Sequence, residues 1–145
     1  MSNETRERDI YLAKAMGWRY VPHGPETAKM YGDGAHCLRD PEGRLWRWPW
    51  AKTEDETWAY SAPNFHEWES AKAKLLRWLA ADDDRFEAFY NEIDARYDES
   101  DRENQFSVVS WSRFLLTLTP AQVAESAERA LRRMETAKPG NGGEE

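Results

Sequence analysis

The chain has 145 residues, one cysteine, and 20 basic against 27 acidic side chains, which gives a formal net charge of −7. One cysteine excludes an internal disulfide, no apolar stretch reaches the roughly 18 residues that span a bilayer, and the acidic excess disfavours direct binding to duplex nucleic acid. Residues 1–9 lack the apolar core of a signal peptide, so we expect a cytoplasmic protein. Eight Trp, six Tyr and five Phe supply more buryable surface than disordered chains carry, so we expect a folded chain.

The first elements are a helix and a strand. Apolar residues recur at helical spacing over residues 5–16, and Gly17 is placed to end that helix in a left-handed conformation. The aromatic and β-branched run 18–21 then predicts a short strand that Pro22 stops. The Gly and Pro content of residues 23–34 indicates a loop.

A hairpin is predicted next. Residues 36–39 and 44–48 flank Asp40-Pro41-Glu42-Gly43, in which Pro fixes φ at the second turn position and Gly suits the fourth. Pro49 ends the second strand or confines it to an edge, because it cannot donate to a ladder. A further short strand is predicted at 57–60.

The middle of the chain contains two amphipathic segments. Asn64, followed three residues later by Glu67, indicates the start of a helix over residues 65–80. Residues 85–97 have apolar side chains three and four apart and are interpreted as a helix, although their aromatics also fit a strand. Residues 98–104 are charged and indicate a solvated connection.

The last third begins with a β-prone run. Residues 106–118 predict one bent strand or two short ones. Thr119 and Gln122 then form a capping box around Pro120, which begins the final helix. We therefore expect one α+β domain over residues 5–136, an antiparallel sheet covered by helices in sandwich-like layers, with a disordered tail at 137–145.

The hairpin contains a candidate ligand platform. In an extended chain Trp46, Trp48 and Trp50 share one side, and they would stack a base or another flat ligand while an arginine binds its anionic group. The candidate ligand-binding residues are Arg44, Trp46, Arg47, Trp48 and Trp50, with Arg39 as a further cation. The alternative, which is the commoner use of periodic aromatics, is that the indoles form the core side of a sheet under helix 65–80.

The net charge is concentrated in one segment. Residues 82–104 contain ten acids and three bases, which equals −7, while the remaining residues are balanced with 17 of each. This segment is either a solvated face or an acidic surface that docks on a basic one. The candidate partner-binding residues are Asp82, Asp83, Asp84, Asp94, Asp98, Glu99, Asp101 and Glu103.

No catalytic or metal-binding pattern is found in the sequence. His36 and Cys37 are adjacent and face opposite ways in a strand, and His23 and His66 lie in other segments without metal-ligand spacing. The sequence contains no phosphate-binding glycine loop and no serine elbow. We therefore expect neither enzymatic activity nor a cofactor.

The order of several motifs resembles a known family. Residues 9–18, DIYLAKAMGW, close a helix on Met-Gly-Trp and enter a strand. The other matching residues are Pro63-Asn64-Phe65, Trp68, Trp111, Thr119-Pro120, Ala127 and Ala130-Leu131. Over about two thirds of the chain this order is similar to the phage ABA-sandwich domain family, small phage and prophage proteins in which helices cover an antiparallel sheet. Residues 82–104 depart from that pattern as an insertion.

The resemblance implies a viral accessory role without catalytic residues. Together with the acidic segment, it suggests an anti-defence inhibitor that binds a host protein with a basic surface. The alternative is a binder or sponge for a small anionic or nucleotide-like ligand at the tryptophan hairpin. The oligomeric state is not indicated by the sequence.

Overall fold

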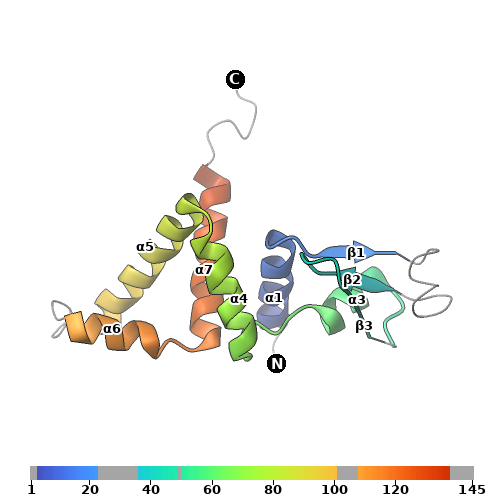
Figure 1. Ribbon diagram of the computed structural model, residues 1–145, viewed down its shortest axis with the longest axis horizontal. Coiled ribbons are helices and arrows are strands. Elements are labelled where there is room, and N and C mark those ends of the chain that lie inside the picture. Colours follow the sequence, from blue (N-terminus) through green and yellow to red (C-terminus); the bar gives the residue numbers. More distant parts are fainter. Residues whose placement is uncertain (1–2, 23–35, 49, 101–107, 138–145) are drawn as a thin grey trace, which may run out of the picture. The chain divides into compact units, whose positions relative to one another are not determined.

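The computed structural model describes residues 3–22, 36–48, 50–100 and 108–137, with side chains for all of these except 3, 98–100 and 108–111 (Figure 1). Their contacts form two compact units, Met1–Asn64 and Phe65–Glu145. Each unit is described by itself below. The expectation of one folding domain over 5–136 stays a prediction. The expectations for the loop 23–34, for residues 101–104 of the connection and for residues 138–145 of the tail lie outside the described residues. Residues 98–100 and 137 are helical, so the predicted connection and tail are wrong at these positions.

The described part of the N-terminal unit combines two helices with a three-stranded sheet. Its elements are α1 (Asn3–Ala15), β1 (Arg19–Val21), β2 (Cys37–Arg39), β3 (Leu45–Arg47) and α3 (Glu54–Ser61). The strands are antiparallel in the order β1-β2-β3, with Tyr20 opposite Leu38 and Leu38 opposite Trp46. Helix α3 packs on all three strands and α1 packs on α3. The α+β fold class is confirmed.

The end of α1 follows the predicted glycine cap. Gly17 has φ of +105°, a conformation that costs glycine little because it has no Cβ. The amide of Trp18 donates to the carbonyl of Ala13 at 3.0 Å, and the amide of Gly17 donates to that of Lys14 at 3.1 Å. These bonds satisfy carbonyls at the helix end and direct the chain into β1.

Helix α3 replaces the strand predicted at 57–60, so that prediction is wrong. The Thr53 hydroxyl accepts from the amide of Glu56 at 3.1 Å, and the Glu56 carboxylate accepts from the amide of Lys52 at 2.7 Å. These bonds satisfy donors at the helix start, and three acidic residues in the first turn oppose the positive end of the helix dipole. The Thr53–Glu56 spacing was the available sequence signal for this helix.

The other end of α3 is closed by a side chain from α1. Arg6 donates through its guanidinium to the carbonyls of Ala59 at 2.7 Å, Ala62 at 2.8 Å and Pro63 at 3.2 Å, and it pairs with Asp9 at 3.0 Å. One side chain therefore satisfies three carbonyls and ties α1 to α3. The buried apolar residues of this unit include Leu12, Ala13, Cys37, Leu38 and Trp58.

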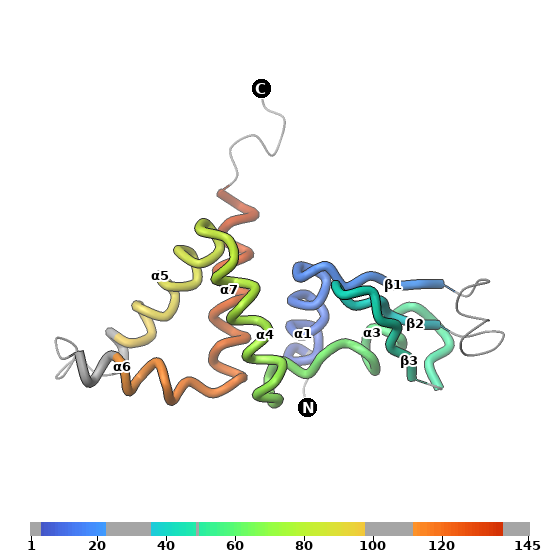
Figure 2. The backbone as a smooth tube through the Cα atoms, viewed as in Figure 1, coloured from blue at the N-terminus to red at the C-terminus, as the bar shows by residue number. Residues whose placement is uncertain are grey.

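The C-terminal unit is helical in its described part. Its elements are α4 (Glu69–Ala80), α5 (Asp83–Ser100), α6 (Val108–Leu116) and α7 (Pro120–Ala137). Helix α5 packs along α7, and α4 packs against both, as the backbone trace shows (Figure 2). The buried residues of this packing include Leu75, Leu79, Phe89, Ile93, Val123, Ala127 and Leu131.

One boundary in this unit differs from the predictions, and one open alternative is resolved. The middle helix begins at Glu69, preceded by Trp68 as its N-cap residue, so the predicted start at residue 65 is wrong by four residues. Residues 85–97 are helical, which resolves the open alternative in favour of the helix. The cap of that helix is Asp82, whose carboxylate accepts from the amide of Arg85 at 3.0 Å.

The strand predicted over 106–118 is also wrong, since residues 108–116 form α6. Branched and aromatic side chains favour strands, but a short apolar run does not by itself distinguish a strand from a buried helix segment. Here the ring of Phe114 packs edge-on against Tyr97 of α5 at 5.2 Å. Tertiary packing therefore overrides the local propensity.

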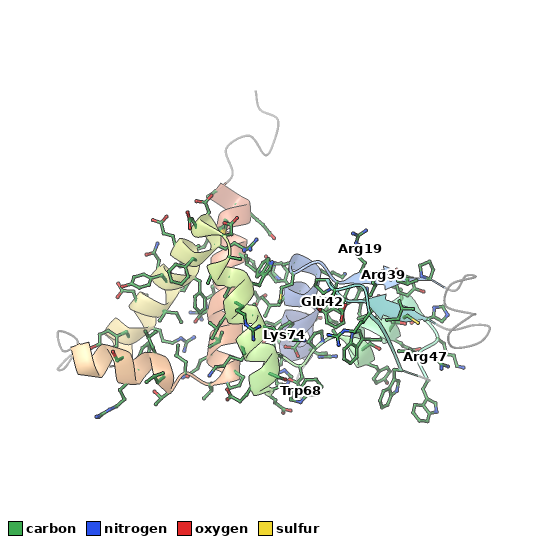
Figure 3. The ribbon with its side chains drawn as sticks, in the orientation of Figure 1. Arg19, Arg39, Glu42, Arg47, Trp68 and Lys74 are labelled. Carbon is green, nitrogen blue, oxygen red and sulfur yellow. The ribbon has the colours of Figure 1, made fainter. Side chains whose placement is uncertain are left out.

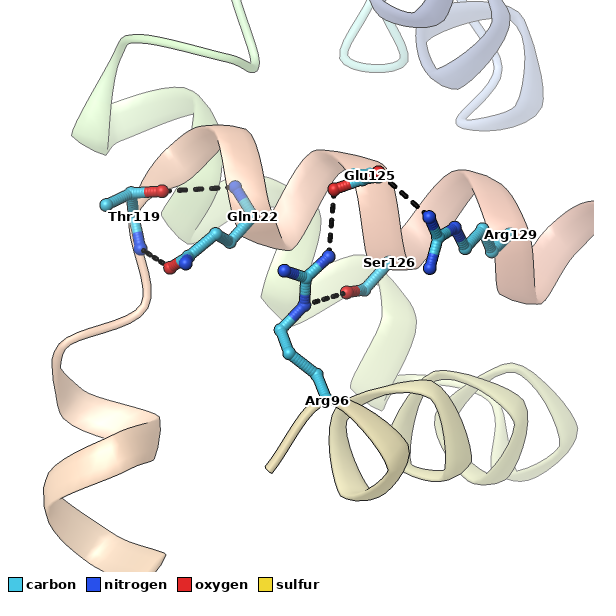
Figure 4. Close-up of polar contacts among 6 residues, drawn as sticks. All are labelled: Arg96, Thr119, Gln122, Glu125, Ser126 and Arg129. Carbon is cyan, nitrogen blue, oxygen red and sulfur yellow. Dashed lines mark hydrogen bonds and ion pairs between the residues drawn. The ribbon is translucent and has the colours of Figure 1, made fainter. Parts of the chain in front are cut away.

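The capping box of α7 is confirmed. The amide of Gln122 donates to the Thr119 hydroxyl at 3.1 Å, and the amide of Thr119 donates to the Gln122 side chain at 2.9 Å (Figure 4). Farther along, Arg96 of α5 reaches Glu125 at 2.9 Å and the Ser126 hydroxyl at 3.3 Å. The α5–α7 packing thus includes polar contacts beside its apolar core.

Candidate functional site

The predicted hairpin is confirmed, and one buried carboxylate organises its turn. Asp40 is 3% exposed, and its carboxylate accepts from the amide of Arg44 at 2.8 Å and from the indole nitrogen of Trp46 at 2.9 Å. The amide of Gly43, at φ +94°, donates to the carbonyl of Asp40 at 2.9 Å. Burial would raise the pKa of Asp40, but the bonds from Trp46 and Arg44 outweigh it and hold the pKa below its usual value.

Trp46 is fixed by this network. Its indole N–H is bound to Asp40, its ring lies 6.0 Å from that of Trp18, and the Arg44 guanidinium lies 6.0 Å from its centroid. Arg44 also pairs with Asp40 at 3.3 Å and with Glu42 at 3.8 Å. Trp46 is therefore part of the hairpin with its indole N–H already bonded, while the Arg44 side chain is ion-paired within the hairpin and stays 63% exposed.

A second group of rings lies beyond the end of β3. Trp48 is central: its ring centroid lies 5.4 Å from Trp50 at an interplanar angle of 49°, and 5.8 Å from Tyr60 of α3 at 25°. The exposed fractions are 41% for Trp48, 67% for Trp50 and 55% for Tyr60. We call these three residues the aromatic cluster.

The structure decides between the two interpretations of these indoles and also changes their grouping. Trp46, Trp48 and Trp50 are all exposed, so the favoured interpretation that they form a sheet core is wrong. They also do not act as one row, because the ring contacts join Trp46 to Trp18 and join Trp48 to Trp50 and Tyr60. Tyr60 escaped the prediction because its segment was interpreted as a strand.

Short local bonds place the cluster. The amide of Ala51 donates to the carbonyl of Trp48 at 3.1 Å, which turns the chain back toward α3. The bond from the Lys52 amide to Glu56 then fixes the entry into α3. Tyr60 lies one helical turn after Glu56, so the two side chains share a face of that helix.

The arginines of the strands alternate with Trp46 in the sheet. Cross-strand register places Arg19 opposite Arg39 and Cys37 opposite Arg47, so these side chains alternate with Trp46 across the sheet. Figure 3 shows Arg19, Arg39 and Arg47 on the three strands. Arg39 donates to the carbonyl of Gly43 at 3.0 Å. Of the predicted anion-binding arginines, Arg44 therefore lies over Trp46, while Arg39 and Arg47 alternate with Trp46 across the sheet.

His36 and Cys37 do not form a reactive pair. His36 Nδ1 lies 2.6 Å from the hydroxyl of Tyr20, and Cys37 is buried. Burial and the nearby carboxylate of Glu54 raise the pKa of Tyr20, with Cys37 contributing in the same direction. Within the described ranges, no three or more His, Cys, Asp or Glu side chains are grouped to hold a metal ion.

The acidic residues of 82–104 have different environments. Donation from the amide of Arg85 lowers the pKa of Asp82, which caps α5. Glu92 is buried and pairs with Arg133 of α7 at 2.7 Å. Asp83, Asp84, Glu87 and Asp94 are exposed. The side chains of the other predicted partner-binding residues lie outside the description: Asp98, Glu99, Asp101 and Glu103.

The outward face of α5 also carries two exposed rings. Phe86 and Tyr90 are about half exposed, with centroids 6.4 Å apart. Asp83, Glu87, Tyr90 and Asp94 are spaced four, three and four residues apart along α5, so the three carboxylates share this face of the helix. We call these five residues the α5 face.

No protein-family model, curated protein or solved structure matches this chain. None of the helices described is both long and apolar enough to cross a membrane. The functional argument therefore depends on the geometry of these surfaces.

Proposed function

We propose that the chain is a non-catalytic binding protein that contacts a partner protein through the aromatic cluster. The observation that supports this proposal is the exposure of three adjoining rings, Trp48, Trp50 and Tyr60. With about 200 Å² of surface for each ring, these fractions leave roughly 300 Å² of aromatic surface accessible. Contiguous patches of this size on soluble proteins are often functional.

A protein partner fits this surface better than a small ligand. Ligand sites are concave and bury most of the ligand, whereas these rings are 41–67% exposed. Trp and Tyr are the residues that dominate binding energy at protein interfaces. Arg44, one of the arginines expected to hold an anionic group, is already paired with Asp40 and Glu42. A nucleotide-like ligand remains the second candidate, and the experiment below includes it.

The α5 face supports a partner with a basic surface. Exposed carboxylates beside exposed rings attract a cationic surface and raise the association rate more than the affinity. The C-terminal unit contains 17 acidic and 11 basic residues, a net −6, so the field around α5 favours such an encounter. Reversing Glu87 and Asp94 to lysine should slow association, with the largest effect at low salt.

The biological setting in this proposal comes from the family resemblance. A phage or prophage accessory protein would act in the cytoplasm of its host, and a host defence protein is the partner that we propose. The exposed aromatic surface and the α5 face are consistent with an inhibitor that works by occupying a surface.

The test compares the wild-type chain with Trp50→Ala and with Trp68→Ala. Trp68, in the C-terminal unit, is 55% exposed against 67% for Trp50 and serves as the matched control (Figure 3). A partner captured from host extract, identified and purified should bind wild type and Trp68→Ala equally, and should bind Trp50→Ala about 30-fold more weakly, as expected for an interface hot spot.

Equal affinity of the purified partner for wild type and Trp50→Ala would contradict the proposal. In a parallel calorimetric titration, adenosine monophosphate should give no heat of binding. Binding of that nucleotide to wild type, lost in Trp50→Ala, would favour the ligand-binding alternative.

A further inference from the structure

The charges around the aromatic cluster suggest what the partner presents to it. The segment from Trp48 to Tyr60 contains the whole cluster together with Lys52, Glu54, Asp55 and Glu56, so its net charge is −2. All three carboxylic residues are exposed. The surroundings of the exposed rings are therefore acidic, opposite to the cationic site predicted from the sequence.

Glu56 is the carboxylic residue of this segment that shares a helix face with Tyr60. It accepts from the Lys52 amide at 2.7 Å and lies one helical turn before Tyr60 on the same face of α3. Tyr60 in turn stacks on Trp48 at 5.8 Å. A cation on the outer face of these rings would have both the π-electrons and a negative side chain beside it.

The arginines nearest in sequence do not compete for this position. Arg44 lies over Trp46 and is paired with Asp40 and Glu42. Arg47 alternates with Trp46 along β3 and points to the other face of the sheet. These positions favour a cation that the partner supplies.

We propose that the aromatic cluster binds an arginine side chain of the partner, stacked on Trp50 and Trp48 with Glu56 as the counter-charge. A guanidinium is planar and stacks on flat aromatic faces, whereas a compact ammonium is held best inside an enclosed cage. The interplanar angles are 49° between Trp48 and Trp50 and 25° between Trp48 and Tyr60, and the rings are 41–67% exposed, which suits the planar group. This inference rests on the proposed function and specifies its contact.

The experiment uses the full chain and three peptide probes. The first alternates arginine with glycine, the second replaces arginine with lysine, and the third replaces it with citrulline, which keeps the planar shape and removes the charge. Binding is followed by the ¹H–¹⁵N signals of the Trp48 and Trp50 indoles. The arginine peptide should shift these two signals, the lysine peptide should bind about threefold more weakly, and the citrulline peptide about tenfold more weakly.

Two variants test the assigned roles without removing the fold. Trp50→Leu keeps an apolar side chain and loses the π face, and Glu56→Gln removes the charge while glutamine still serves in the capping box. Each should weaken the arginine peptide about threefold to tenfold, and the effect of Glu56→Gln should diminish with added salt. Trp68→Leu, in the other unit, should leave binding unchanged.

Equal binding of the arginine and citrulline peptides, or shifts of Trp68 in place of Trp48 and Trp50, would overturn the arginine assignment. The proposed function has its own separate readout. If the purified partner depends on Trp50 while all three peptides leave the indole signals unmoved, the aromatic cluster is the interface and the arginine contact is wrong.

Discussion

Replacing Asp40 should destabilise the hairpin by an amount that the structure allows us to calculate. Its carboxylate accepts two short bonds, from the Arg44 amide at 2.8 Å and from the Trp46 indole at 2.9 Å. Bonds to a charged group contribute about 1.5–3 kcal/mol each, and the lower value applies here because Trp46 can be rehydrated at the surface. Asp40→Ala should therefore lower the free energy of unfolding of the N-terminal unit by about 3 kcal/mol.

The isosteric variant Asp40→Asn should lose about half as much, because its amide oxygen can still accept one bond. The two should also differ from wild type in pH dependence. The folded-state pKa of Asp40 lies below its unfolded value of about 3.9. The carboxylate therefore stabilises the fold fully above the unfolded pKa, and this contribution is lost as the pH falls through the folded pKa. The stability difference between wild type and Asp40→Asn should shrink below pH ~4.

Native-state hydrogen exchange of the slowest β2 amides measures this local stability, since a chain with two compact units need not unfold in one step. Glu42→Ala is the matched control. Glu42 pairs with Arg44 only at 3.8 Å, and both side chains are about two-thirds exposed. Glu42→Ala should therefore alter the free energy of unfolding by no more than about 0.5 kcal/mol. An Asp40→Ala variant no less stable than Glu42→Ala would refute the role assigned to the buried carboxylate.

Three further predictions concern the other polar contacts. Arg6→Lys should lower the free energy of unfolding of the N-terminal unit by about 2 kcal/mol, because a single ammonium cannot reach the three carbonyls at the end of α3. Hydrogen exchange of the α3 amides measures this loss, and unchanged exchange would contradict the prediction. Arg133→Ala leaves the buried Glu92 carboxylate unpaired, so it should lower the urea midpoint of unfolding more than Glu92→Gln does. The midpoint is measured by helical circular dichroism, and the reverse order would contradict the cost assigned to an unpaired Glu92 carboxylate. Thr119→Ala should destabilise the C-terminal unit by about 1 kcal/mol and Thr119→Ser should restore most of it, and a loss shared by both variants would argue against the cap.

The aromatic cluster shows where sequence reasoning stopped. The spacing of Trp46, Trp48 and Trp50 identified a segment rich in indoles, but alternation along a strand does not say which side of a sheet is covered. That depends on α3, whose position brings Tyr60 against Trp48. The same helix supplies Glu56. The charge of the segment that contains the rings is therefore negative, whereas the sequence predicted arginines beside them.

Features decided within four or five residues were predictable from the sequence. The glycine that ends α1, the Asp-Pro-Glu-Gly turn and the Thr119–Gln122 box all depend on bonds between near neighbours, and the structure contains each of them. The α+β class and the helicity of residues 85–97 followed from side-chain periodicity.

Only tertiary structure decided the short apolar segments and the surfaces. Residues 57–60 and 108–116 have side chains that suit strands, yet they are helical. A local cap at Thr53 begins α3, while Arg6 of α1 and Tyr97 of α5 contact these helices from distant positions in the chain. Composition likewise shows a chain rich in tryptophan with a net charge of −7, but it does not show where these side chains lie. Whether an indole is core or surface, and whether a carboxylate caps a helix, pairs with an arginine or faces solvent, depends on which distant residues pack beside it, and local sequence does not contain that information.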